Sequence, residues 1–162
     1  MDEEGGWLHR LAAALALAGM GVVAAVGLYT VGDVVMRYVF NAPLPGAVDV
    51  VTYGLALAVG AVMPWGVVAR SHVAVTILAD RAGPRGRALL DAFVLTVVAG
   101  FFVLLAWRIG LYALERLGAG DTMWILAWPV WPVWGLVALG LAGAAVTAVL
   151  VAALGWRAAA RV

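Results

Sequence analysis

Between residues 31 and 50, the charged side chains gather around one predicted turn at residues 41–46. Asp33 and Arg37 lie four residues apart with the acid first, the favourable orientation for an ion pair on a helix. Arg37 could instead reach Asp49 across the turn that begins at Asn41. A third interpretation is an arginine that extends to water beside solvated acids. The chemistry expected of this group is ion pairing that fixes the ends of two helices.

A second polar group, Arg70 and His72, follows the next apolar run. An arginine-rich stretch at the end of an apolar helix can contact anionic lipid headgroups. For His72 alone, an interfacial position without a special role is the simpler interpretation. We predict that Arg70 and His72 fix helix ends on the side opposite to Arg37.

Residue types that carry catalysis are scarce. The only histidines are His9 and His72, both predicted at the same boundary, which disfavours a bis-histidine haem within the membrane. Histidines and acids are not clustered with metal-ligand spacing, and the chain has no cysteine. It also lacks a glycine-rich phosphate loop and a serine nucleophile motif. We predict no enzyme activity, no cofactor and no metal site.

Ion transport by this chain alone is also disfavoured. Proton-coupled exporters and pumps keep a charged group at mid-membrane to bind the moving ion. Here the carboxylates lie at or beyond the ends of the apolar runs, for example Asp33, Asp49, Asp91, Glu115 and Asp121. The sequence therefore predicts a chain that supports a function rather than one that moves a solute by itself.

Four apolar runs must position these residues, at 11–35, 47–68, 88–111 and 131–154. Each is long enough to cross a hydrocarbon core of about 30 Å, which takes about 20 helical residues. The runs do not alternate polar and apolar residues as barrel strands do. The sequence predicts an all-α integral membrane protein with four transmembrane helices in a single domain over residues 1–162.

The composition agrees with this prediction. Apolar residues make up 66% of the chain, charged residues only 12%, and the mean hydropathy is +1.07. An ordinary soluble domain is about 25% charged, so these charges are too few to cover a water-exposed surface. The net charge of +1 does not suggest a nucleic-acid partner. The acidic start and the long run 11–35 differ from a signal peptide, whose apolar core is about 7–15 residues, so we expect a retained first span.

The arginines predict the orientation. Seven of the ten basic residues fall on one side of a four-span topology, namely Arg10, Arg70, Arg81, Arg85, Arg87, Arg157 and Arg161. The other side has Arg37, Arg108 and Arg116. Because basic residues are enriched on the cytoplasmic side, both termini are predicted to be cytoplasmic.

Small residues recur every four positions within the runs, in the series Gly140, Ala144, Ala148 and Ala152 and in the pairs Ala56–Gly60 and Gly21–Ala25. Such ridges allow close helix packing, either inside this chain or with a partner's helices. Pro64 lies inside the second run and should kink it or free a carbonyl. The sequence does not decide whether Pro64 forms a functional hinge or only a tolerated kink.

Three stretches resemble a known family, the small membrane subunit (DctQ-like) of tripartite ATP-independent periplasmic (TRAP) transporters. They are DVVMRYVFNAPLPGAVD, RSHVAV and TMWILAWPVWPVWGLVALG, at residues 33–49, 70–75 and 122–140. Family members tend to show an Arg-Tyr-x-Phe-Asn/Gly-x-Pro pattern after the first span and a basic-x-His run after the second. The chain departs at Asp49, where Glu is commoner, and at Thr76, where an acid is frequent.

The resemblance implies the partners and the location. A large membrane subunit would carry the substrate and sodium sites and move by an elevator-like mechanism. A periplasmic solute-binding protein would deliver the solute, usually an organic acid. The small subunit would be a non-catalytic, multi-pass scaffold in the bacterial inner membrane that packs along the large subunit and helps dock the binding protein. Asp33, Arg37, Asn41, Asp49, Arg70 and His72 are the candidate residues for structure and assembly.

Two other functions remain open from the residues. One is a small exporter that works as an oligomer, for which the missing mid-membrane carboxylate predicts no ion-driven flux. The other is a membrane anchor for a redox enzyme, which an absorbance scan for haem would detect.

Overall fold

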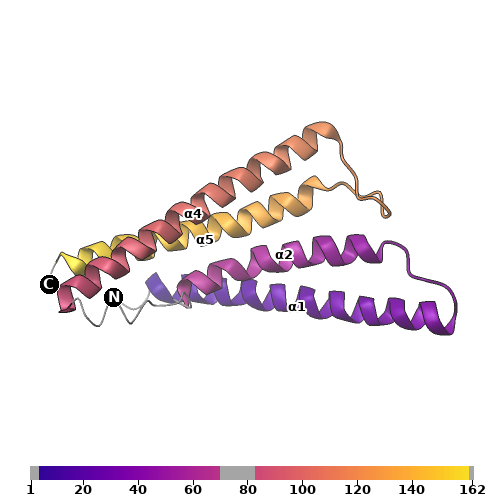
Figure 1. Cartoon of the computed structure of the whole chain (residues 1–162), viewed down its shortest axis with the longest axis horizontal. Coiled ribbons are helices and arrows are strands. Elements are labelled where there is room, and N and C mark those ends of the chain that lie inside the picture. Colours follow the sequence, from indigo (N-terminus) through magenta and orange to yellow (C-terminus); the bar gives the residue numbers. More distant parts are fainter. Residues whose placement is uncertain (1–3, 70–82, 161–162) are drawn as a thin grey trace.

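The computed structural model describes residues 4–69 and 83–160, in which the chain folds into four long helices (Figure 1). They are α1 (Glu4–Val39), α2 (Ala47–Val68), α4 (Gly83–Ala119) and α5 (Trp131–Ala159). Each contains a segment long and apolar enough to cross a membrane. Within the described residues, extended pairing is limited to an isolated bridge between Thr122 and Pro129. The predicted all-helical fold with four helices able to span a membrane is confirmed.

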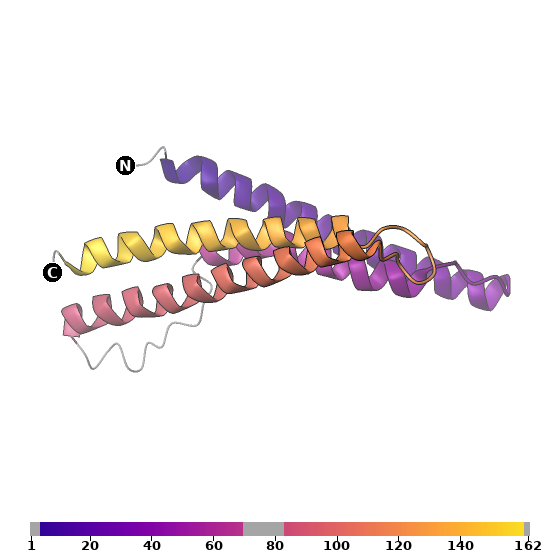
Figure 2. The ribbon, with the colours of Figure 1, turned by 90° about the horizontal axis from the view of Figure 1, so that it is seen from above.

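The helices form two antiparallel hairpins, α1 with α2 and α4 with α5, and α2 packs against α5 to join them. We call residues 40–46 the first loop and residues 120–130 the second loop. Figure 1 shows both loops at one end of the molecule, with the start of α1 and the end of α5 at the other. In the view from above, α1 diverges from α5 toward its own N-terminal end (Figure 2). Of the four described helices, α1 packs closely against α2 alone.

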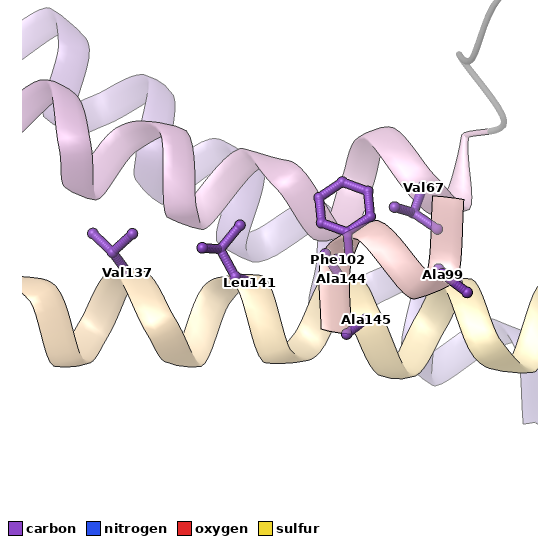
Figure 3. Packing of buried hydrophobic residues seen from close by; sticks show 8 residues of the cluster. Val67, Ala99, Phe102, Val137, Leu141, Ala144 and Ala145 are labelled. Carbon is purple, nitrogen blue, oxygen red and sulfur yellow. The ribbon is translucent and has the colours of Figure 1, made fainter. Parts of the chain in front are cut away.

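The core lies where α2, α4 and α5 meet, and much of it is alanine (Figure 3). Its buried residues are Val67, Ala99, Phe102, Val137, Leu141, Ala144, Ala145 and Ala148. Ala144 and Ala148 are 0% exposed, so the small-residue ridge of α5 serves the internal bundle. Small side chains let the helix backbones approach closely, which is what drives association where lipid removes the hydrophobic effect.

The ridge of α1 is used differently. Gly21 and Ala25 are exposed, and a Cβ added at Gly21 would meet nothing within 4 Å. Similar spacing in α1 and α5 therefore leads to different surroundings. The pattern predicts that helices can approach one another, while the fold decides whether they do.

Two helices run well beyond the expected spans. α1 has 36 residues and α4 has 37, which correspond to about 54 Å and about 56 Å of helix. α2 has 22 residues, about 33 Å, and so matches a hydrocarbon core of about 30 Å. Hydropathy marks only the apolar part of a helix. α1 and α4 continue until a residue with positive φ follows them, Asn41 (φ 53°) and Gly120 (φ 66°).

Candidate functional site

The candidate residues of the first loop lie along one face of α1. Tyr29, Asp33 and Arg37 are spaced by four, so they share a face that points at the loop. The Tyr29 hydroxyl donates to the Pro45 carbonyl at 2.8 Å, and the Leu44 N–H donates to Asp33 Oδ1 at 2.8 Å. These contacts fold the first loop back against its own helix.

Arg37 pairs with Asp33. Arg37 Nη2 lies 2.7 Å from Asp33 Oδ2, which decides between the two pairings that the sequence left open. The Asp33 side chain is 8% exposed but that of Arg37 is 58% exposed. Because water screens an exposed guanidinium, this pair stabilises the fold by about 0–1 kcal/mol. Asp33 contributes more to the structure by accepting a hydrogen bond from the backbone N–H of Leu44 in the first loop.

Asn41 acts through its backbone. It adopts a left-handed conformation with φ of 53°, which asparagine tolerates better than most residues. The Met36 carbonyl accepts from the N–H of Phe40 at 3.2 Å and from the N–H of Ala42 at 3.1 Å, and this turn ends α1. The side chain itself is exposed, so Asn41 fixes the helix end by its φ angle.

Asp49 joins the two hairpins. It is 5% exposed, and its Oδ2 accepts the N–H of Ile125 at 2.8 Å and of Leu126 at 3.0 Å. Hydrogen bonds to a carboxylate are about twice as strong as those between neutral groups. Sequence reasoning offered Asp49 as a partner for Arg37 and did not anticipate this contact with the second loop.

Gly46 completes that contact. It has a φ of 75°, and a Cβ built there would lie 2.6 Å from Cγ of Leu126. Leu126 therefore occupies the space that any other residue at position 46 would need. Glycine suits this position because it adopts the positive φ without strain and leaves room for the approach of the second loop.

The second loop is ordered by its own backbone. The Met123 N–H donates to the Trp128 carbonyl at 2.7 Å, and the Val130 N–H donates to the Asp121 carbonyl at 3.1 Å. Where the loop begins, the Asp121 carboxylate pairs with Arg116, whose guanidinium carbon lies 4.5 Å from the centroid of the Tyr112 ring. Sequence reasoning missed this ion pair, because Arg116 and Asp121 both lie beyond residue 111, where the third predicted span ends.

The hairpins also touch near the middle of α2, at Gly60 and Gly140. A Cβ in place of one hydrogen of Gly140 would overlap the carbonyl oxygen of Gly60. That oxygen lacks a helical donor, because residue 64, four positions later, is proline and has no N–H. The Gly140 Cα–H therefore points at a carbonyl that Pro64 has freed, a contact worth about 0.5–1 kcal/mol.

Two candidate residues, Arg70 and His72, lie outside the described residues. Within residues 4–69 and 83–160, histidine and acidic side chains do not gather in a group of three that could hold a metal ion. The described polar contacts at the loop end are thus structural in kind: they close the first loop, order the second and join the hairpins.

Comparison with known proteins identifies the family. Residues 26–158 match the family described as tripartite ATP-independent periplasmic transporters, DctQ component. No match was found among curated proteins or among solved structures. The family match covers both loops, the contact of Asp49 with the second loop and the crossing of Gly60 with Gly140. The chain therefore belongs to the DctQ component family of TRAP transporters, and it is a membrane component of such a transporter, as the resemblance predicted.

Proposed function

We propose that this chain is the small, non-catalytic scaffold of a sodium-coupled TRAP transporter in the bacterial inner membrane. The observation that carries the proposal is the internal use of its buried acids. Asp33 and Asp49, the buried acids in the described part, both have partners within the chain. An ion-coupling site would need a charged group free to bind and release its ion.

The outer faces of the helices supply the packing surface that a scaffold needs. Large apolar side chains are exposed along α1 and α4, among them Leu17, Leu28, Phe93 and Leu104. In a membrane these faces meet either lipid or the helices of the large subunit. We propose that part of this surface packs along the large subunit, which would carry the substrate and sodium sites.

The positions of the arginines support an orientation. The two loops lie at the end that has the fewer basic residues in the predicted topology, and the start of α1 and the end of α5 lie at the other end (Figure 1). Because basic residues favour the cytoplasm, we propose that both termini are cytoplasmic and that the loops face the periplasm.

The first loop is then the candidate for helping to dock the binding protein. The helix end and loop beside it expose Arg37, Tyr38 (84%) and Phe40 (64%) on a backbone that Asp33 holds in place. An exposed arginine next to two aromatic rings is a common composition of protein-binding surfaces. The solute delivered by that protein is proposed to be an organic acid.

Uptake by reconstituted vesicles tests the scaffold function. Vesicles would hold this chain alone, the large subunit alone, or both, with the binding protein and its organic acid outside and a sodium gradient applied. We expect uptake only when both subunits are present. Sodium- or proton-driven flux with this chain alone would exclude the scaffold function and favour the oligomeric exporter.

A pair of arginine variants tests the residue at the first loop. Arg37→Ala is expected to lower uptake, recovery of the large subunit in a pull-down, or both. Arg157→Ala, the same change at the opposite end of the molecule, is the matched control. Unchanged assembly and unchanged uptake in Arg37→Ala would remove this residue from the proposed site.

A further inference from the structure

The second loop has an apolar outer face. Trp124, Ile125 and Trp128 are 93%, 53% and 66% exposed, whereas Met123 is 7% exposed. Leu126 points the other way, against Gly46 immediately before α2. The loop is therefore two-sided: one side is packed into the protein, and the other presents two indole rings and an isoleucine to the surroundings.

This exposure belongs to an ordered loop. Backbone hydrogen bonds between Met123 and Trp128 close it, and Asp49 holds the N–H groups of Ile125 and Leu126. Because these contacts fix the backbone of the loop, the Cα–Cβ bonds of Trp124 and Trp128 stay directed to its outer face. What surrounds the loop must therefore accept exposed apolar rings.

The depth of the loop follows from the length of α2. The apolar segment of α2, Ala47–Val67, has 21 residues and so spans about 32 Å, hardly more than a hydrocarbon core of about 30 Å. Its first turn, which contains Asp49, must therefore lie at the edge of the hydrocarbon. Since Asp49 binds the tip of the second loop, that tip lies at the same depth, and Figure 1 shows the loop extending level with the start of α2.

The chemistry of the loop fits that depth. Residues 122–130 contain no charged side chain. Tryptophan combines a large apolar ring with one N–H donor, and it is enriched where hydrocarbon meets the headgroups of a bilayer. A surface that docks a soluble protein would instead project into water. The C-terminal end of α1, which extends beyond the start of α2, is better placed for that (Figure 1).

We infer that the second loop is a bilayer-interface anchor: Trp124 and Trp128 insert among lipid headgroups, and Asp49 is the positioning residue that sets their depth. The anchor ties the junction of the two hairpins to the membrane surface. The inference needs a lipid bilayer around the chain, and it does not depend on the orientation or on the transported solute.

The absence of cysteine in the chain allows a direct test with spin labels. Single variants Trp124→Cys and Trp128→Cys, with Ala42→Cys in the first loop as the water-exposed control, would be labelled with a nitroxide in vesicles of phosphatidylethanolamine and phosphatidylglycerol. The readout is collision of the label with oxygen, which concentrates in lipid, relative to a water-soluble nickel chelate. We expect the ratio of oxygen collisions to nickel collisions to be several-fold higher at positions 124 and 128 than at position 42.

Two results would overturn the inference. Labels at 124 and 128 that meet the nickel chelate as often as the label at 42 would place the loop in water. Labels that lose access to both reagents when the large subunit is added would show that a protein covers the loop. If the tryptophan variants do not accumulate, Ile125→Cys gives the same readout, because its contact with Asp49 is made by the backbone.

The role of Asp49 has its own readout. Asp49→Ala in the Trp124→Cys background should raise nickel collisions at position 124, because the loop loses its tie to the first turn of α2. A label at Gly110, an open position on α4, should be unaffected. Unchanged collisions at position 124 would show that Asp49 does not set the depth of the loop.

Discussion

The first and second loops lie at the same end of the molecule, and in each a buried carboxylate accepts backbone N–H groups. One contact lies within a single hairpin, whereas the other joins the two hairpins. In the first loop Asp33 accepts the N–H of Leu44, eleven residues away, so the contact closes a single hairpin. In the second loop Asp49 accepts the N–H of Ile125, 76 residues away, so the contact joins two hairpins. One buried carboxylate shapes a loop, and the other holds the two halves of the bundle together.

This difference shows how a bundle of two hairpins gains a fixed shape. Each hairpin is closed by its own loop and by packing along its length. The angle between the hairpins is set by the core that α2 shares with α4 and α5, together with the backbone contact of Gly60 with Gly140 and the contact of Asp49 with the second loop. Changes at Gly140 or Asp49 should therefore affect the whole bundle, whereas changes at Asp33 or Arg37, whose hydrogen bonds in the described residues lie within their own hairpin, should stay local.

The largest effect is expected from Gly140→Ala. Its Cβ would overlap the Gly60 carbonyl, so α2 and α5 must move apart. Such overpacking costs about 3 kcal/mol, near the upper end of its usual range. The measurement is the thermal unfolding midpoint in detergent. Gly135→Ala is the control on the same helix, since a Cβ there meets nothing within 4 Å; an equal loss in both variants would mean that the crossing is not tight.

Asp49→Ala should have the next largest effect, about 2 kcal/mol, because it leaves the N–H groups of Ile125 and Leu126 without a partner. Limited proteolysis should cut the second loop faster in this variant and leave the first loop unchanged. Asp91→Ala removes a carboxylate from an exposed site on α4 and serves as the control for charge. Faster cutting of both loops would contradict the conclusion that each loop is held independently by its own carboxylate.

A double-mutant cycle would sharpen the comparison. Asp49→Ala and Gly140→Ala weaken the same junction, so their combined cost should fall short of the sum by about 1 kcal/mol. Asp33→Ala acts within one hairpin, so its loss of unfolding free energy should simply add to the loss caused by Gly140→Ala. Unfolding free energies of the single and double variants provide the check. If Asp33→Ala couples to Gly140→Ala as strongly as Asp49→Ala does, the contact of Asp33 with the first loop also stabilises the junction of the hairpins.

The sequence predicts those features that depend on local spacing. Hydropathy located the four spans, and the interval of four residues indicated the pair of Asp33 with Arg37. The helices α1 and α4 extend beyond the predicted spans, because hydropathy marks only the apolar part of a helix. The positive φ of Asn41 suits asparagine, and that preference was the available signal for the end of α1.

The contacts between hairpins were not predictable in the same way. Asp49 meets Ile125 only because two hairpins cross at a particular angle, and the spacing of residues within one helix carries no information about that angle. The spacing of Gly21 and Ala25 resembles that of the α5 ridge, yet it faces outward. Pro64 did indicate a freed carbonyl, but its neighbour, Gly140, could be named only from the fold.

The smallest effect on stability is expected from Arg37→Ala. The Arg37 side chain is 58% exposed and its ion pair with Asp33 is screened by water, so the cost should stay below about 1 kcal/mol. Asp33 still accepts the hydrogen bond from the N–H of Leu44 in this variant, so the first loop should remain closed and resist proteolysis. A loss as large as that of Asp49→Ala would place Arg37 among the residues that hold the fold. A small loss together with impaired assembly or uptake would instead assign Arg37 to the surface that meets a partner, because its guanidinium would then be dispensable for folding.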